Sequence, residues 1–429
     1  MKILFLADNF PPEKNAQASR VYERASFWVR WGHEVTVITC APNFPEGIVY
    51  KGYRNRWHFT EEIEGIRVVR VKTFIAANAR MIRRTLDYLS FAPAGVLAGL
   101  FEEKPDVVVA TSPHLFSALA GWGLAALRGL PFVMELSDLW PESIAAVGAV
   151  REGFALRNIE KLELFLYRKA ARVVALTPSF KSNLVERGVP AGKISVVING
   201  VDLSRYSPRE KDRELAAQYG LAGDVFVAGY LGTHGMAHAL TNVLQAAERV
   251  RDPRVRFLFV GAGAEREKLV QTAQEKKLRN VVFASAQSKE RMPAFWSLCD
   301  VALVHLKNTP LFRMVIPSKI FEAMGMGLPV LLACPAGEAS GIVESEGAGM
   351  CVAAEDPGAL AEAVDAMSSN REMLARFAGA SRAAAPKYSR ERQAQDFLKA
   401  MEGIGSVADF RPYGEAGLEA KAMEKAAGG

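Results

Sequence analysis

The feature that most constrains this chain is an alternation of short apolar runs with amphipathic segments. Residues 20–31, for example, show an apolar face with helical spacing and are followed by Gly32. The strand-like runs of the first half are KILFLAD (2–8), EVTVITC (34–40), IRVVRVKTF (66–74), DVVVATS (106–112), PFVMELS (131–137), RVVALTP (172–178) and KISVVIN (193–199). Continuous apolar strands that alternate with helices predict a parallel sheet covered on both faces.

The same alternation starts again after a polar stretch at about 202–211, which has the composition of a linker. The later strand-like runs are DVFVAGYLG (224–232), RFLFVGAGAE (256–265), NVVFASA (280–286), DVALVHL (300–306), LPVLLA (328–333) and GMCVAA (349–354). At 429 residues the chain also exceeds what one hydrophobic core usually serves. We therefore expect two doubly wound, Rossmann-like α/β domains at 1–200 and 201–385, a helix at 386–402 and a flexible tail at 403–429.

Two features of the apolar runs argue against a signal peptide and against a membrane-spanning helix. Asp8 interrupts the first run and no small-residue cleavage site follows it, which is unlike a signal peptide. The longest apolar run, 89–101, is too short to cross a bilayer. We expect a cytoplasmic protein. Its four cysteines lack paired metal-ligand spacing and are expected to be core thiols; they are Cys40, Cys299, Cys334 and Cys351.

Positive charge gathers in the first half of the chain. Residues 1–200 hold 25 Lys and Arg against 19 Asp and Glu, out of 53 and 47 in the whole chain. This bias indicates an anionic surface or acceptor, with a solvated face of mixed charge as the alternative. Arg80, Arg83 and Arg84 precede apolar residues and could dock the segment 80–91 peripherally on anionic lipid. An ordinary helix with its apolar face in the core is the alternative, and no nucleic-acid partner is indicated.

Two loops of the first domain follow strands, where open α/β folds bind ligands. In residues 9–20, Ala16, Ala18 and Ser19 are small enough for a ligand to approach the helix N-terminus, and we assign them with Arg20 to ligand binding. A simple turn with Ser19 as the N-cap is the alternative.

The second loop, SDLWPE, follows the strand that ends near residue 137. Asp138 offers lone pairs to a sugar hydroxyl or a proton in transfer, and Trp140 offers a flat face to an acceptor sugar. Alternatively, Ser137 or Asp138 caps the next helix and Trp140 belongs to the core.

Two glycine-rich turns follow strands of the second domain. In GYLGTHGMAH, Gly232 and Gly235 permit close approach of a phosphate to the backbone, and Thr233 and His234 can donate hydrogen bonds. In VGAGAERE, Gly261 and Gly263 are expected to make room for a nucleotide, although glycines needed only for packing explain this pattern equally well.

The strongest local signal is the segment 316–330, IPSKIFEAMGMGLPV. Pro317 and Ser318 are expected to start a helix that Gly327 ends. Near its N-terminus Lys319 can face a phosphate, and Glu322, one turn later, can accept hydrogen bonds from ribose hydroxyls. A solvent-facing Lys–Glu pair is the alternative.

Taken together, these segments resemble the group 1 family of retaining glycosyltransferases, which have the GT-B fold. The resemblance covers nearly the whole chain and rests on NFPPEKNAQASR, SDLWPES, VVALTPSFKSNL, KISVVINGVDLSRY, GYLGTHG, FLFVGAGAERE and PSKIFEAMGMGLPVL. Within the family, GYLGTHGMAH and SDLWPES resemble bacterial N-acetylfucosamine-type transferases of O-antigen and capsule assembly. The resemblance implies a lipid-linked or membrane-associated glycan as acceptor, and the acceptor-binding residues are then expected to be Ala16, Ala18, Ser19, Arg20 and Trp140.

Three positions depart from the pattern of the family. Glu322 matches the second carboxylate of the family's E-x7-E arrangement, but Met314 stands at the first. Thr233 and His238 stand where the family commonly has Arg and Lys. Phosphate neutralisation is therefore expected from Lys319 with the amides of the GTHG turn, and Met314 is assigned to the donor sugar.

The expected reaction is transfer of a sugar from a nucleotide-diphosphate donor with retention. Asp138, Thr233, His234 and Lys319 are the expected catalytic residues; donor contacts are expected from Gly232, Gly235, Gly261, Gly263, Met314, Ser318 and Glu322. No D-x-D pair ends a strand, so neither a metal nor a cofactor is expected. A nucleotide-sugar epimerase of this fold and a non-catalytic nucleotide-sugar-binding protein remain alternatives, whereas a glycogen phosphorylase-like enzyme would be much longer.

Overall fold

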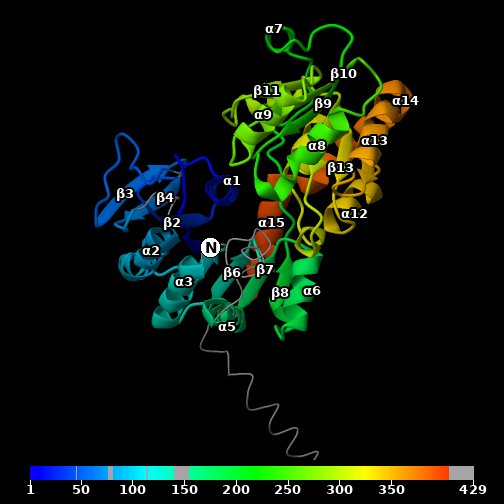
Figure 1. Cartoon of the computed structure of the whole chain (residues 1–429). Coiled ribbons are helices and arrows are strands. Elements are labelled where there is room, and N and C mark those ends of the chain that lie inside the picture. Colours follow the sequence, from blue (N-terminus) through cyan, green and yellow to red (C-terminus); the bar gives the residue numbers. More distant parts are fainter. Residues whose placement is uncertain (45, 76–80, 113–114, 140–153, 405–429) are drawn as a thin grey trace, which may run out of the picture.

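The computed structural model describes residues 1–44, 46–75, 81–112, 115–139 and 154–404, which form two α/β lobes (Figure 1). Each lobe contains a sheet of its own, with helices packed on its faces. The predicted fold class, two Rossmann-like domains that face one another, is confirmed.

The first lobe has an eight-stranded sheet in the order β3-β4-β2-β1-β5-β6-β7-β8. Its strands are β1 (Lys2–Leu6), β2 (Glu34–Cys40), β3 (His58–Ile63), β4 (Ile66–Val71), β5 (Val107–Thr111), β6 (Phe132–Leu136), β7 (Arg172–Ala175) and β8 (Ile194–Val196). All of them run parallel except β3, which pairs antiparallel with β4 at the sheet edge. Strand β3 was not predicted, because four of its six side chains are polar and all six are exposed or half-buried.

Both faces of the first sheet are covered, as predicted. Leu4 and Leu6 of β1 belong to one core cluster, whereas Ile3 and Phe5 belong to another on the opposite face. The helices of this lobe are α1 (Ala16–Arg30), α2 (Met81–Phe101), α3 (Leu115–Arg128), α5 (Phe154–Lys169) and α6 (Pro178–Glu186), with a 3-10 turn at Ala191–Lys193.

Helix α1 begins at Ala16, four residues earlier than predicted. The Asn15 side chain caps it by accepting a hydrogen bond from the Ala18 amide at 2.8 Å. Ser19 is therefore not the N-cap; its hydroxyl donates to the Asn15 carbonyl oxygen at 3.0 Å.

The second lobe has a six-stranded parallel sheet in the order β11-β10-β9-β12-β13-β14. Its strands are β9 (Phe226–Leu231), β10 (Val255–Val260), β11 (Val281–Ala284), β12 (Val301–His305), β13 (Val330–Ala333) and β14 (Gly349–Val352). The α-helices around it are α7 (Arg213–Gln218), α8 (Leu240–Ala247), α9 (Arg266–Glu275), α10 (Met292–Trp296), α11 (Lys319–Met326), α12 (Glu338–Ser345), α13 (Pro357–Ser369) and α14 (Arg371–Ala384). Three 3-10 turns complete it: Met236–His238, Pro310–Arg313 and Ala385–Tyr388.

The chain crosses between the lobes a second time, and its last described helix, α15 (Arg390–Met401), packs on the first lobe (Figure 1). The Trp28 indole N–H of α1 donates to the Ala394 carbonyl oxygen of α15 at 3.0 Å. The two crossings lie side by side, since Val201 and Ser389 form a parallel β-bridge. The helix at 386–402 was predicted, but its place against the first lobe was not.

Candidate functional site

A pocket of about 450 Å³ lies at the carboxyl ends of the strands of the first sheet and reaches the second lobe. Loops that follow β1, β2, β4, β6 and β7 line it, together with Val315, Ile316 and Ser318 of the second lobe. The pocket is close to the point where the strand order reverses, between β1 and β5. Open α/β sheets bind ligands at such a point.

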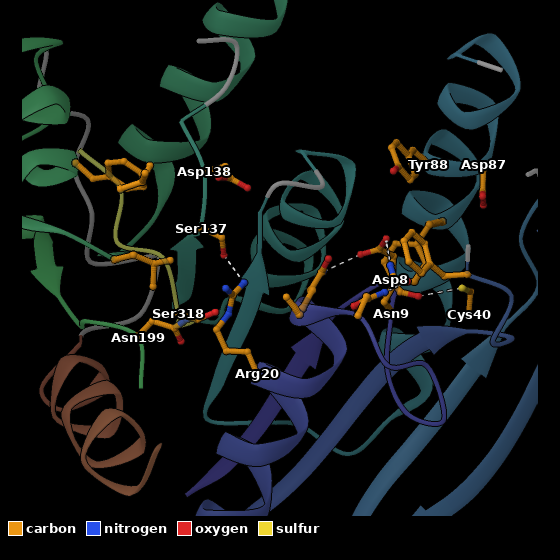
Figure 2. Close-up of a pocket in the computed structure, with 18 of the residues that line it drawn as sticks. Asp8, Asn9, Arg20, Cys40, Asp87, Tyr88, Ser137, Asp138, Asn199 and Ser318 are labelled. Atoms are coloured by element: carbon orange, nitrogen blue, oxygen red, sulfur yellow. Dashed lines mark hydrogen bonds between the residues drawn. The ribbon is translucent and has the colours of Figure 1, made fainter. Parts of the chain in front are cut away.

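Of the first-loop residues assigned to the acceptor, Ala16 and Arg20 line this pocket. Ala18 and Ser19 are instead buried behind it, where Ser19 makes the backbone contact described above. The Arg20 guanidinium donates to the Ser137 hydroxyl at one end of the pocket (Figure 2). This contact joins the first loop to the loop after β6.

Beneath Arg20 lies a fully buried ion pair between α1 and β6. Arg24 donates to both carboxylate oxygens of Glu135 at 2.8 Å, and the Arg20 Nε lies 3.4 Å from Glu135 Oε1. Burial by itself would raise the pKa of Glu135, but the two guanidinium groups outweigh it and lower this pKa to about 2. The Arg24 guanidinium also lies over the Phe397 ring of α15, 4.1 Å from its centroid. Helix α15 thus packs against the buried ion pair.

Asp138 lines the pocket next to Ser137, as its predicted role requires. Burial raises the pKa of Asp138 to about 6, although nearby Arg20 opposes the rise. A carboxyl group with this pKa can accept or release a proton near neutral pH. Trp140, the other residue assigned from this loop, lies outside the described residues.

The opposite end of the pocket is formed by polar residues that the sequence analysis did not single out. Asp8 follows β1 directly and is 8% exposed. Its carboxylate accepts hydrogen bonds from Gln17 at 2.8 Å and from Asn9 at 2.5 Å. Asp87 and Tyr88 of α2 also line this end of the pocket (Figure 2). The only signal for Asp8 in the sequence was its position at the end of a buried strand.

In the second lobe, the turn 232–235 follows β9 at the reversal of the second sheet. A Cβ atom at Gly261 would lie 1.9 Å from the Gly232 carbonyl oxygen, and one at Gly263 would lie 2.3 Å from that of His234. Gly261 and Gly263 therefore allow the two turns to pack backbone against backbone. This is the packing alternative left open above, and their contact with a nucleotide stays a prediction.

Lys319 begins α11 and points at this turn. Its side chain is buried, its amino group lies 3.8 Å from the centroid of the Tyr230 ring, and no hydrogen-bond partner for it is present among the described residues. Burial lowers the pKa of Lys319 to about 7, with Glu322 opposing the shift. A buried amino group without a hydrogen-bonded counter-charge is unfavourable, so the arrangement favours an anionic ligand.

His234 lies in the same turn and is fully buried, with no described partner for either ring nitrogen. Burial, together with Arg266 and Lys319, lowers its pKa to about 4, so the imidazole is neutral at pH 7 and keeps one N–H to donate. The Thr233 side chain is exposed, and the Thr233 carbonyl oxygen accepts the Tyr230 hydroxyl at 2.8 Å. Unlike His234, His238 has a hydrogen-bond partner, since its Nδ1 lies 3.2 Å from the His305 carbonyl oxygen.

The rest of the segment 316–330 has the predicted local structure. Ser318 is the N-cap residue of α11 and lines the pocket, and Gly327 ends the helix with a φ of 71°. The Glu322 carboxylate accepts a hydrogen bond from the Trp296 indole at 3.1 Å, and burial raises its pKa.

Met314 lies at the contact between the lobes. Its side chain packs against the core of the first lobe, and its carbonyl oxygen accepts the Thr177 hydroxyl at 2.9 Å. The donor-sugar contact assigned to Met314 stays a prediction.

Among the described residues, no group of three or more His, Cys, Asp or Glu side chains is arranged to hold a metal ion. Within the same residues, no helix is both long enough and apolar enough to span a membrane.

Comparison with known proteins assigns both lobes. Residues 15–200 match the model of the glycosyl transferase 4-like domain, and residues 211–384 match that of the glycosyl transferases group 1. A putative colanic acid biosynthesis glycosyl transferase of Escherichia coli is 27% identical over 335 residues, which are 76% of this chain and 82% of that protein. A probable glycosyltransferase of Pseudomonas aeruginosa is 24% identical and is matched over 64% of its length and 61% of this chain.

The fold is also that of a solved structure. An Anabaena protein crystallised in complex with UDP-glucose superimposes with a TM-score of 0.72 at 19% identity, covering 94% of this chain and 100% of that one. Each lobe matches a glycosyltransferase domain, and the two Rossmann-like lobes together superimpose on the Anabaena protein. The chain therefore belongs to the group 1 glycosyltransferases and has the GT-B fold.

Proposed function

We propose that this protein transfers a sugar, with retention, from a nucleotide-diphosphate sugar to a hydroxyl of a lipid-linked glycan at the cytoplasmic face of a membrane. The observation that supports the donor site is the buried amino group of Lys319, which has no hydrogen-bond partner among the described residues. It lies beside the turn 232–235, and the adjacent residue, Ser318, lines the pocket between the lobes. The diphosphate of a nucleotide sugar supplies the anion that this amino group lacks.

Each remaining group has a role in this reaction. Lys319, the neutral His234 imidazole and Thr233 stabilise the charge that develops on the leaving diphosphate. Glu322 accepts hydrogen bonds from the ribose, and Asp138 positions the reacting hydroxyl and receives its proton. This chemistry uses neither a metal nor a cofactor.

The names of related proteins support both the class of product and the donor. The relatives include proteins named for colanic acid and teichuronic acid biosynthesis and a lipopolysaccharide N-acetylglucosaminetransferase. The Anabaena structural neighbour was crystallised with UDP-glucose. We infer a role in the synthesis of a cell-surface polysaccharide such as O-antigen, capsule or exopolysaccharide.

The decisive experiment is a panel of nucleotide sugars incubated with the protein and monitored for slow hydrolysis. One donor should release its nucleoside diphosphate, and Lys319→Met should abolish the release. Lys276→Met is the matched control, because Lys276 forms a surface ion pair with Glu248 on the second lobe. Conversion of the donor to an isomeric nucleotide sugar would instead identify an epimerase, and binding without any turnover would identify a binding protein.

The donor sugar is proposed to be 6-deoxy and N-acetylated, as in UDP-N-acetylfucosamine. Met314 stands where the family has a carboxylate for sugar hydroxyls, and an apolar side chain favours a methyl group over an unpaired hydroxyl. Donors that differ only at carbon 6 test this, with Met314→Glu as the sharper variant. Equal or better use of the hydroxylated donor by the natural protein would contradict the proposal.

Association with the membrane is proposed to be peripheral and to use α2. Phe91 of the segment 80–91 is buried, whereas Leu86 and Leu89 are 48% and 44% exposed; Arg80 lies outside the described residues. Flotation with vesicles tests the proposal: binding should require anionic lipid, weaken with salt, and fall when Arg80, Arg83 and Arg84 become Glu. Failure to bind anionic vesicles at low salt would contradict it.

A further inference from the structure

The Glu322 carboxylate of α11 is contacted by a tryptophan from the neighbouring helix. Trp296 is the last residue of α10 and is fully buried, and its indole N–H donates to Glu322 Oε2 at 3.1 Å. The Glu322 side chain is half-buried, and its second oxygen, Oε1, has no hydrogen-bond partner among the described residues. The protein thus holds one oxygen and leaves the other for a ligand.

The Trp296 indole is itself fixed by the core of the second lobe. It belongs to the same core cluster as Leu298 and as Ile320 and Phe321 of α11. A large ring in a close-packed core has little room to change its rotamer. Its N–H is therefore a fixed partner for the carboxylate, whereas a glutamate without such a partner samples several rotamers.

A comparison with Trp28 shows that this carboxylate does more than satisfy a buried indole. Both indoles are fully buried, but Trp28 donates to a neutral group, the Ala394 carbonyl oxygen, at 3.0 Å. A backbone carbonyl satisfies an indole N–H without placing a charge in the interior. Burial raises the pKa of Glu322, so a carboxylate at this place costs free energy that a neutral acceptor would not cost. The cost indicates a use for the charge besides the contact with Trp296.

The surroundings of Glu322 favour its ionised form. Burial raises the pKa of Glu322, whereas the hydrogen bond from Trp296 lowers it. The other groups that lower it are cations of α11, of the loop before α10 and of α15: Lys319, Lys289 and Arg390. Tyr206, the remaining described titratable group nearby, stays neutral because burial and the charge of Glu322 raise its pKa. With these partners in place, Glu322 can accept hydrogen bonds as a carboxylate.

We propose that Trp296 is a positioning residue for the donor: it holds Glu322 Oε2 so that Oε1 is left for the ribose hydroxyls of the nucleotide. The proposal rests on the function proposed above, in which Glu322 binds the ribose, and adds the group that orients it. Without the indole N–H, the inner oxygen loses its partner, so the carboxylate either turns towards water or takes up a proton. Both responses weaken a contact with ribose hydroxyls.

Calorimetric binding of UDP and of 2′,3′-dideoxy-UDP tests the proposal. The two probes differ only in the ribose hydroxyls, and the corresponding pair is used if the nucleotide-sugar panel selects another base. The natural protein should bind UDP about a hundredfold more tightly than the dideoxy probe. Trp296→Phe should weaken UDP binding about tenfold and leave binding of the dideoxy probe unchanged. Equal weakening of both probes, or no weakening of UDP binding, would overturn the proposal.

Trp28→Phe is the matched control, because it removes an equally buried indole N–H from the first lobe. It should leave the affinity for both probes unchanged. A loss of the preference for UDP in this control would show a general effect of altered packing and would also overturn the proposal. If Trp296→Phe does not fold, benzothienylalanine in place of Trp296, which exchanges the N–H for sulfur at nearly the same volume, provides the same measurement.

The pH dependence of UDP binding separates positioning of Glu322 from a simple loss of packing. Because the Trp296 N–H lowers the pKa of Glu322, Trp296→Phe should raise it. Glu322 is then protonated at a higher pH, so the loss of UDP affinity at the acid end of the profile should begin at a higher pH. Titration of UDP itself is the same for both proteins and cancels in the comparison. Superimposable profiles would contradict an effect through Glu322.

Failure of this proposal is distinguishable from failure of the proposed function. If Glu322→Ala abolishes the preference for UDP but Trp296→Phe does not, Glu322 still binds the ribose and only the role of Trp296 is lost. If the natural protein binds both probes equally, the ribose assignment of Glu322 fails together with this proposal. Donor hydrolysis in the nucleotide-sugar panel would still support the proposed transferase in either case.

Discussion

The two lobes present opposite kinds of polar group to the space between them. In the first lobe three charged groups already have partners: Arg24 contacts Glu135, Arg20 contacts Ser137, and Asp8 contacts neighbouring amides. In the second lobe, the Lys319 amino group and both His234 ring nitrogens have no described partner. Paired groups hold their geometry without a ligand, whereas unpaired groups gain most of their stabilisation when a ligand arrives. Substitutions should therefore act on stability in the first lobe and on donor use in the second.

The largest effect is expected from Glu135→Leu. It leaves the Arg24 guanidinium buried without its counter-charge, so the free energy of unfolding should fall by about 3–5 kcal/mol. Chemical denaturation measures this loss. The double variant Arg24→Met with Glu135→Leu should lose less, because only Arg20, which keeps its contact with Ser137, is then left without the carboxylate. A similar loss in both variants would show that packing volume, and not pairing, is what matters there.

Lys319→Met should have the opposite effect to Glu135→Leu: it should lower donor use without lowering the stability of the fold. Removing a cation that stabilises the leaving diphosphate should lower kcat/KM for the donor on the order of a hundredfold or more. The free energy of unfolding without donor should stay the same or rise, because an unpaired buried amino group has been removed. Steady-state kinetics and denaturation on the same preparation test both parts. A destabilised Lys319→Met variant would remove the contrast between the lobes.

Glu322→Ala should reduce donor use by roughly a hundredfold in kcat/KM through loss of two hydrogen bonds to the ribose. Since the Glu322 carboxylate also accepts the Trp296 indole N–H, Glu322→Gln is the matched control that keeps a carbonyl oxygen for this contact. A folded Glu322→Ala protein with near-normal kcat/KM would contradict the ribose assignment.

The smallest expected effect is a pH dependence of donor binding. Burial lowers the pKa of Lys319 to about 7, so above that pH the free protein has a neutral amine that must take up a proton to bind the diphosphate. The donor Kd should rise about tenfold per pH unit above about 7 and become nearly independent of pH below it. Calorimetric titration at several pH values measures this slope, and Lys319→Met should abolish it. A Kd that does not change between pH 7 and 9 would contradict the assignment.

The same depressed pKa affects the stability of the protein without donor. Between the folded value near 7 and the ordinary value of 10.5, the unfolded chain binds the extra proton. The contribution of Lys319 to stability should therefore increase as pH rises through this window.

The sequence by itself determined most of the local structure. The continuous Val, Ile and Leu runs predicted the buried parallel strands, and Ser318 and Gly327 predicted the limits of α11. Those signals lie within a few residues of one another, so periodicity and capping reveal them. Strand β3 was missed because an exposed edge strand does not need an apolar pattern, and the start of α1 was misplaced because Asn15 competed with Ser19 as the cap.

Only the tertiary structure decided which groups are paired. Arg24 and Glu135 are 111 residues apart, and the Trp28 indole contacts a carbonyl oxygen 366 residues away on α15. The sequence identified Lys319 as a phosphate-binding candidate, yet its position over the Tyr230 ring depends on how α11 packs against the turn after β9. Asp8 reads in the sequence only as the end of a strand. Charge compensation is a property of neighbours in space, and chain topology, which local patterns do not encode, determines those neighbours.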